Sequence, residues 1–406
     1  MPAYSGKFQY GGVQGACKLS FDQETCVVTP AAGAPLAFDL GDVERTARAE
    51  WDLELTLYTG KKLQLRQFGS LFGRMAGELI AAWRDRTVQC LLLEDLEEVM
   101  RCPGAVNGAA AEIRLYRTNL AVLPDAGTPF QLRLAEVDSV AFDQGSYSIV
   151  LETSGGRVAL GKLARKTDEM HAKLRECWDG LRTRSAQALL DRFPFLPPDA
   201  LQRVTAIMPE GRSVRLSALA AIDPKLPGAL ITQAVDRGLK PYFDALLEMS
   251  DRNGLMAGYK FIRQEEQPQA EAEEPPEGET GETGEEEEQP EKPPLFFWFF
   301  FPLRNNVMAW EASTGTGRAT YFFRPTPPAD FETAVARITR GLALVNFRRE
   351  PVYLSDAALE RQPRFRRYII GARKLSDLRA LRAAMLGRAI HSTPEAWSEQ
   401  VRALAK

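Results

Sequence analysis

Apolar and polar residues alternate along short stretches of the first 190 residues, which is typical of β-strands with one buried face. In DLELTLYTGKKLQL, which begins at Asp52, leucines occupy alternate positions on both sides of a Thr-Gly turn. An amphipathic helix is predicted from about Ser70, because the following apolar residues have helical spacing. The pattern predicts seven strands before this helix, near Phe8, Leu19, Val27, Phe38, Thr46, Leu55 and Leu65.

The same pattern occurs a second time, 94 residues further along the chain. The segment CVVTPAAGAPLAFDLGDVERT from Cys26 aligns with LAVLPDAGTPFQLRLAEVDSV from Leu120 in two prolines, one glycine and several apolar positions. Each copy continues into a helical stripe of apolar residues, where Trp83 corresponds to Trp178 after a one-residue slip. The sequence therefore predicts an internal duplication.

Several short antiparallel strands followed by one amphipathic helix resemble the pleckstrin-homology-like (PH-like) fold. The two copies are similar to tandem PH-like domains, such as those of histone-chaperone middle domains and of bacterial families without an assigned activity. The resemblance implies binding of peptides or proteins, and in some members of phosphoinositides. Lipid-binding members carry a basic cluster between their first two strands, whereas residues 11–18 here contain one lysine. Protein binding is therefore favoured over lipid binding.

The second half of the chain combines helical stretches with aromatic-rich strands. The run LFFWFFFPL from Leu295 is apolar on both faces, which predicts a central strand; contact with an apolar partner or a membrane is the alternative. GYKFIR, VMAWEAS and RATYFFR supply its neighbours in an antiparallel meander, and TGTGR predicts a turn. Helices are predicted over residues 329–347 and 374–390.

These elements predict a multidomain α+β chain. The expected domains are PH-like barrels over residues 1–98 and 103–190, a helical linker over 191–256, and a C-terminal α+β domain over 257–406. Residues 264–294 contain thirteen Glu and one Lys, which predicts a disordered acidic insertion in the last domain. Residues 337–406 carry a net charge of +9, so the overall charge of −3 is a sum over unlike segments.

Basic residues near the end of the chain are the candidate binding residues. Some flank Phe365 and Tyr368 and others share a helix face, which suits phosphate contacts with stacking on bases. Contact with the acidic insertion, tethered in the same domain, and a solvated helix face are the other interpretations. The candidates are Arg361, Arg364, Arg366, Arg367, Arg373, Lys374, Arg379, Arg382 and Arg388.

Few residues are suited to catalysis or metal binding. The chain has two histidines, His171 and His391, both predicted in helices and neither in a Ser/His/Asp or Cys/His pattern. Its five cysteines have irregular spacing without Cys-x-x-Cys, which indicates neither a disulfide framework nor a zinc site. We expect no catalytic, cofactor-binding or metal-binding residues and therefore no enzyme, with an enzyme of unrecognised class as the alternative.

No stretch has the length and apolarity of a membrane span, and the N-terminus lacks the pattern of a signal peptide, so a cytoplasmic location is expected. The predicted function is a non-catalytic intracellular scaffold or adaptor that binds protein partners through tandem PH-like domains. The alternative is a nucleic-acid-associated or histone-chaperone-like factor that uses the basic C-terminus and the acidic insertion.

Overall fold

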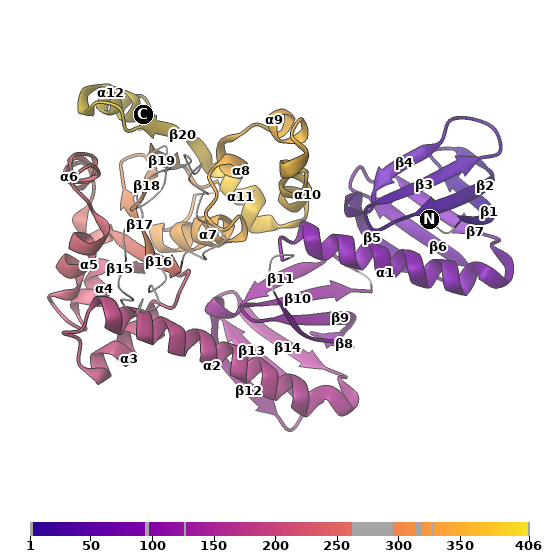
Figure 1. Ribbon diagram of the computed structural model, residues 1–406, viewed down its shortest axis with the longest axis horizontal. Coiled ribbons are helices and arrows are strands. Elements are labelled where there is room, and N and C mark those ends of the chain that lie inside the picture. Colours follow the sequence, from indigo (N-terminus) through magenta and orange to yellow (C-terminus); the bar gives the residue numbers. More distant parts are fainter. Residues whose placement is uncertain are drawn as a thin grey trace, which may run out of the picture. The chain divides into compact units, whose positions relative to one another are not determined.

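The computed structural model describes residues 3–93, 97–125, 127–261, 295–313, 319–326 and 328–404. The predicted acidic insertion and the whole TGTGR turn lie outside these residues. The described chain is a mixed α+β structure with curled antiparallel sheets (Figure 1). It divides into two compact units, of which unit 1 comprises Met1–Ala188 and Ala336–Met385, and unit 2 comprises Leu189–Val335 and Leu386–Lys406. The segment expected as one C-terminal domain thus contributes to both units.

The first sheet of unit 1 contains all seven strands that the alternation predicts. They are β1 (Ala3–Tyr10), β2 (Val13–Phe21), β3 (Thr25–Pro30), β4 (Leu36–Asp39), β5 (Val43–Arg48), β6 (Asp52–Leu57) and β7 (Lys62–Arg66), in the order β4-β3-β2-β1-β7-β6-β5. The alternating leucines, Leu53, Leu55, Leu63 and Leu65, are at most 1% exposed. Helix α1 (Phe72–Cys90) packs Met75, Leu79 and Trp83 into the same core.

The second sheet of unit 1 has the same strand order, β11-β10-β9-β8-β14-β13-β12. Its strands are β8 (Glu98–Val106), β9 (Ala109–Tyr116), β10 (Asn119–Pro124), β11 (Phe130–Arg133), β12 (Val137–Asp143), β13 (Ser148–Thr153) and β14 (Gly156–Gly161), followed by α2 (Thr167–Arg192). The Trp83 indole donates to the Val43 carbonyl at 3.0 Å, and Trp178 donates to the Val137 carbonyl at 2.9 Å. The two segments of the sequence repeat therefore fix helix to sheet through equivalent hydrogen bonds.

Helix α1 lies between the two sheets of unit 1 (Figure 1). Residues 336–385 add a helical layer to this unit, in which Gly341 packs closely on Leu381. Its elements are α7 (Phe331–Leu344), whose first turn belongs to unit 2, α8 (Glu350–Tyr353), α9 (Asp356–Glu360), the 3-10 turn η7 (Pro363–Phe365), α10 (Arg366–Lys374) and α11 (Ser376–Ala384).

Unit 2 is built on a six-stranded sheet of order β15-β16-β17-β18-β19-β20. Its strands are β15 (Val214–Arg215), β16 (Met256–Phe261), β17 (Leu295–Pro302), β18 (Met308–Ala312), β19 (Ala319–Phe323) and β20 (Met385–Ile390), and its remaining helices are α3 (Pro198–Ile207), α4 (Leu216–Ala220), α5 (Leu226–Ala234), α6 (Lys240–Met249) and α12 (Pro394–Leu404). The aromatic run forms the buried central strand β17, as predicted. Phe261 pairs with Leu295, so the ends of β16 and β17 that flank the acidic segment are neighbours.

The helix predicted over residues 374–390 is wrong beyond Ala384, where the chain enters β20. The leucine spacing that indicates a helix continues by coincidence into residues whose backbone pairs with β19 instead. His391 accordingly follows a strand and does not end a helix. None of the helices in the described residues has the length and apolarity needed to cross a membrane.

Candidate functional site

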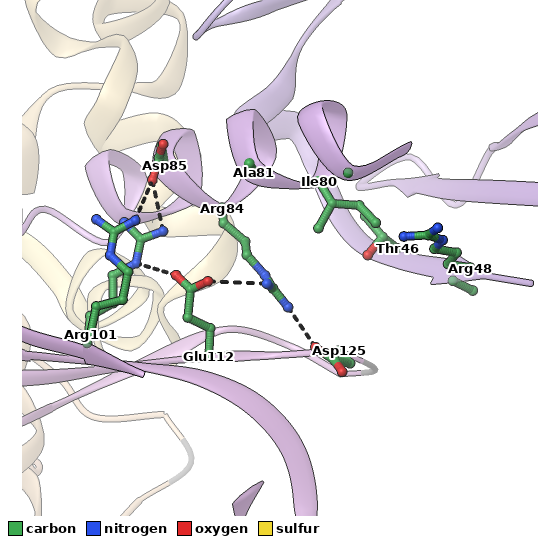
Figure 2. Close-up of a pocket in the computed structure, with 12 residues that line it drawn as sticks. Thr46, Arg48, Ile80, Ala81, Arg84, Asp85, Arg101, Glu112 and Asp125 are labelled. Carbon is green, nitrogen blue, oxygen red and sulfur yellow. Dashed lines mark hydrogen bonds and ion pairs between the residues drawn. The ribbon is translucent and has the colours of Figure 1, made fainter. Parts of the chain in front are cut away.

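A charged cleft of about 610 Å³ lies in unit 1 where α1 faces the second sheet (Figure 2). Gly77 and Ala81, one turn apart on α1, leave the space open, since a Cβ at Gly77 would meet no atom within 4 Å. We call this the inter-sheet cleft. It is lined by Thr46, Ala47, Arg48, Gly77, Ile80, Ala81, Arg84, Asp85, Arg101, Glu112, Arg114 and Asp125.

Ion pairs join the two walls of the inter-sheet cleft. Arg84 of α1 points between two carboxylates of the second repeat, 3.2 Å from Glu112 and 2.6 Å from Asp125 (Figure 2). Asp85, the next residue on α1, lies 2.8 Å from Arg114 and 3.6 Å from Arg101. Adjacent residues of opposite charge on one helix thus meet their complements on β8, on β9 and directly after β10.

Burial strengthens this network at its centre. The Arg114 side chain is 4% exposed, and its Nε lies 2.6 Å from Glu112. Burial alone disfavours the charged guanidinium, but the adjacent carboxylate of Glu112 outweighs that effect and raises the pKa of Arg114. The Nε of Arg84 is buried and has no hydrogen-bond partner in the described part of the chain.

The open end of the cleft carries a cation that the network does not use. Arg48 is exposed, lies 5.9 Å from the ring of Phe72, and has no carboxylate within 4 Å in the part of the chain that the structure describes. With Arg48 included, the lining of the cleft contains four arginines and three carboxylates. Such a surface can bind a charged segment, and Arg48 is placed to receive an anionic group.

The nine basic residues predicted to bind are spread over several elements. Arg361 follows α9, Arg364 lies in η7, and Arg366, Arg367, Arg373 and Lys374 lie on α10. Arg379 and Arg382 belong to α11, whereas Arg388 lies on β20 in unit 2. The structure therefore brings eight of them into unit 1 and leaves one in the other unit.

Three of these residues contact a corner of the first sheet that we call the acidic corner, residues 39–43, which includes the 3-10 turn η1 (Leu40–Asp42). Arg366 Nε lies 3.1 Å from Asp39, and Arg373 Nη1 lies 3.0 Å from Asp42. The buried amine of Lys374 donates to the Val43 carbonyl at 2.7 Å. Much of the predicted basic surface is thus used inside the molecule.

The acidic corner also contains a buried pair formed within the first repeat. Arg86 of α1 donates to both oxygens of Asp39, at 2.9 and 2.8 Å. Burial acts to raise the pKa of Asp39, but hydrogen bonds from Arg86 and from the Gly41 amide outweigh it and lower the pKa. The Asp39 carboxylate is therefore held in its charged form.

Burial dominates at the neighbouring groups of the corner. It raises the pKa of Asp42, and the Arg373 guanidinium opposes this rise. It lowers the pKa of Lys374 and raises that of Cys90 to about 12. Since a thiol with such a pKa carries little thiolate, Cys90 is not a reactive cysteine.

Arg379 and Arg382 of α11 also have hydrogen-bond partners inside the molecule. Arg382 donates to backbone carbonyls and to Asp356, and Arg379 donates to the Arg373 carbonyl at 2.8 Å. A second cavity of about 520 Å³ is lined by Arg373, Arg379 and Arg382. In it, the Arg373 guanidinium lies 4.1 Å from the ring centre of Tyr58. Contact with the acidic insertion concerns residues outside the described part of the chain.

A buried polar cluster in unit 2 has no signal in the sequence. Glu311 of β18 accepts a hydrogen bond from Thr320 of β19 at 2.6 Å and lies 3.2 Å from His391 Nε2. The Trp397 indole donates to the Thr320 hydroxyl, whose own proton points to Glu311. Toward His391 Nε2, the Thr320 and Glu311 oxygens can therefore only accept, so this ring nitrogen is assigned the proton. The ring of Tyr242 stacks on the imidazole at 4.1 Å.

This cluster joins β18 and β19 to α12. The Thr320 residue is 0% exposed and the His391 side chain is 3% exposed. Among the described residues, His391 Nδ1 has no hydrogen-bond partner. The four groups come from two parts of the chain about 70 to 80 residues apart, which is why no motif marks them.

Within the described residues, no group of three or more His, Cys, Asp or Glu side chains is arranged to hold a metal ion. No protein-family model matches the chain, and no curated protein is significantly similar to it.

Proposed function

We propose that this chain is a non-catalytic adaptor that binds segments of partner proteins through its two sheet-and-helix repeats, which we interpret as tandem PH-like domains. Each repeat has seven strands in one order, followed by a helix held by a tryptophan. The observation that carries the proposal is the inter-sheet cleft, which the two repeats form together (Figure 2).

The size and chemistry of the cleft favour a polar peptide as its ligand. Its volume of about 610 Å³ lies within the range of known ligand sites, about 300–1,000 Å³. Seven of its twelve lining residues are charged, which is more than is usual for a small-molecule site. A partner segment with an acidic side chain would pair with Arg48 at the open end, while the ion pairs around Arg84 keep the two walls in place.

A nucleic-acid role is the second candidate, because a few basic residues lack a carboxylate partner. Arg361, Arg364 and Arg379 have no carboxylate within 4 Å in the described residues, and Arg364 lies over the ring of Phe365. Three other candidates are bound to the acidic corner. Since few cations remain for phosphate contacts, we favour protein binding.

Affinity capture with two charge-reversed chains tests the proposal. Arg48→Glu changes the open end of the cleft, and Arg74→Glu is the control, an exposed arginine of α1 that lies outside the cleft lining. Proteins captured by the wild type should be lost with Arg48→Glu and retained with Arg74→Glu, and a purified partner should bind the former at least about tenfold more weakly.

Two outcomes would count against the adaptor. Equal capture by both variants would show that the cleft does not bind partners. Capture of nuclease-sensitive material, with an affinity that falls steeply with salt and depends on Arg361 and Arg364, would favour the nucleic-acid role instead.

A further inference from the structure

The acidic corner of the first sheet is covered by a helix of the same chain. Helix α10 places three cations there, two on the carboxylates of Asp39 and Asp42 and one on the Val43 carbonyl. These cations occur at positions i, i+7 and i+8, so they share one face of the helix. The helix thus contacts a short acidic surface through cations on one of its faces.

The backbone fits as closely as the charges. A Cβ at Gly371 of α10 would lie 2.9 Å from the Cys90 carbonyl at the end of α1. A Cβ at Gly41 of the corner would lie 3.1 Å from the Ile370 side chain. Glycine on each surface therefore permits a close approach, which gives the site a shape requirement in addition to its charge.

The second repeat shows that this acidity is particular to the first. Asp39 and Asp42 correspond to Arg133 and Glu136 in the aligned segment. Arg133 lies 3.6 Å from Glu136, so the second repeat neutralises its own carboxylate. In the first repeat, the cations that act on Asp42 come from α10. The corner of the first repeat thus depends on a basic element from outside the sheet.

We propose that the acidic corner is a second recognition site of the adaptor, which binds a basic amphipathic helix, and that α10 is a ligand in cis which a partner's helix of the same chemistry displaces. This inference rests on the proposed adaptor function and adds to the cleft, which receives an acidic side chain, a separate site for a basic segment. The partner helix carries Arg or Lys at i, i+7 and i+8, with an apolar residue at i+4 and a small residue at i+5, as in RRYIIGARK.

The exposed charges of α10 make such an exchange feasible. The Arg366 side chain is 57% exposed and that of Arg373 is 30% exposed, whereas Asp39 and Asp42 are 6% and 16% exposed. A partner helix with the same cations would form the same ion pairs with these carboxylates after α10 leaves. The cis helix is favoured mainly by its tether, which gives it a high effective concentration. Weakening α10 should therefore open the corner to a helix supplied in trans.

A peptide titration with the full chain tests this directly. The probe is a fluorescein-labelled peptide with the sequence of residues 361–376, and its anisotropy reports binding. The double variant Arg366→Ala, Arg373→Ala should bind the peptide at least about tenfold more tightly than the wild type, because its own helix competes less well. Adding Asp42→Asn should remove that gain, whereas the matched change in the second repeat, Glu136→Gln, should preserve it.

Hydrogen exchange on the wild-type chain provides a second measurement that needs no variant to fold. Excess peptide should accelerate amide exchange in α10 and leave α1 unchanged. The proposal is overturned if the peptide binds both chains equally, if Asp42→Asn leaves its binding unaltered, or if α10 exchange does not respond. If the peptide experiments fail, the dependence of partner capture on Arg48 is unaffected. If capture does not depend on Arg48 but the peptide binds as expected, only the role of the cleft is refuted.

Discussion

The Asp39–Arg86 pair predicts a large and specific loss of stability when Asp39 is replaced by alanine. The same guanidinium binds two carboxylates that differ in burial, since the Asp39 side chain is 6% exposed and that of Glu24 is 62% exposed. Asp39→Ala and Glu24→Ala therefore remove a buried and an exposed partner from one cation. The second variant is the matched control for the first.

The structure gives the expected magnitudes. Asp39 accepts hydrogen bonds from Arg86 Nε and Nη2 and from the Gly41 amide, and its loss leaves a buried cation with its main partner removed. Breaking such a pair from one side costs about 3–5 kcal/mol. Glu24 lies 2.9 Å from the same arginine in solvent, where an ion pair contributes less than about 1 kcal/mol.

Hydrogen exchange of amides in β3 and β4 at increasing urea concentrations measures the free energy of unfolding of each variant, and so the difference between the two. The pKa of Asp39 in the folded chain lies below its ordinary value. Its contribution is therefore complete above the ordinary carboxyl pKa of about 4 and is lost as the pH falls through the folded pKa. The wild type and Asp39→Ala should converge in acid. Equal losses in the two variants, or a gap that widens in acid, would refute this account of the corner.

Three further outcomes follow from the packing. Gly258→Ala should destabilise unit 2 by about 1–3 kcal/mol, because its Cβ would lie 2.4 Å from an indole ring, whereas Gly77→Ala meets no atom within 4 Å and should stabilise α1 by up to about 1 kcal/mol; thermal unfolding compares them, and equal shifts would contradict the contacts. Glu311→Ala should cost about 1–3 kcal/mol and accelerate amide exchange in α12, since it leaves buried donors unpaired; unchanged exchange would argue against the cluster. Iodoacetamide at about pH 8 should label the half-buried Cys177 before Cys90, whose pKa is raised to about 12, as peptide mass spectrometry would show; the reverse order would be inconsistent with burial of Cys90.

Local patterns in the sequence predict most of unit 1's first sheet and the centre of unit 2. Leu53 and Leu55 alternate with polar residues because one face of β6 is buried, and the periodicity records that burial directly. The aromatic run of β17 is apolar on both faces because both are buried: residues 295–301 are at most 7% exposed, and Phe243 of α6 packs on Phe299 and Phe301. Where burial follows the local period, the sequence alone is sufficient.

Pairing between distant residues accounts for what the sequence does not predict. Residues 385–390 continue a helical spacing but form β20, because the edge of β19 supplies backbone partners that local periodicity cannot reveal. The cleft has no sequence signal either, since Arg84 meets carboxylates 28 and 41 residues away. Each of these side chains looks like an ordinary surface charge until the fold brings them together.

The basic C-terminus shows how far charge counting can go. The count of +9 over residues 337–406 identifies a basic segment, but it does not say what that segment contacts. Asp39 and Arg366 are 327 positions apart, so their pairing is a property of the folded unit. Composition therefore selects the candidate residues, and the tertiary structure places three of them at the acidic corner.

A hydrogen-exchange footprint of the chain with a captured and purified partner tests the adaptor most directly. The account predicts protection of α1 around Gly77–Asp85 and of β9, with the same partner released by Arg48→Glu and retained by Arg74→Glu. Protection confined to unit 2, or binding that both charge reversals leave unchanged, would contradict it.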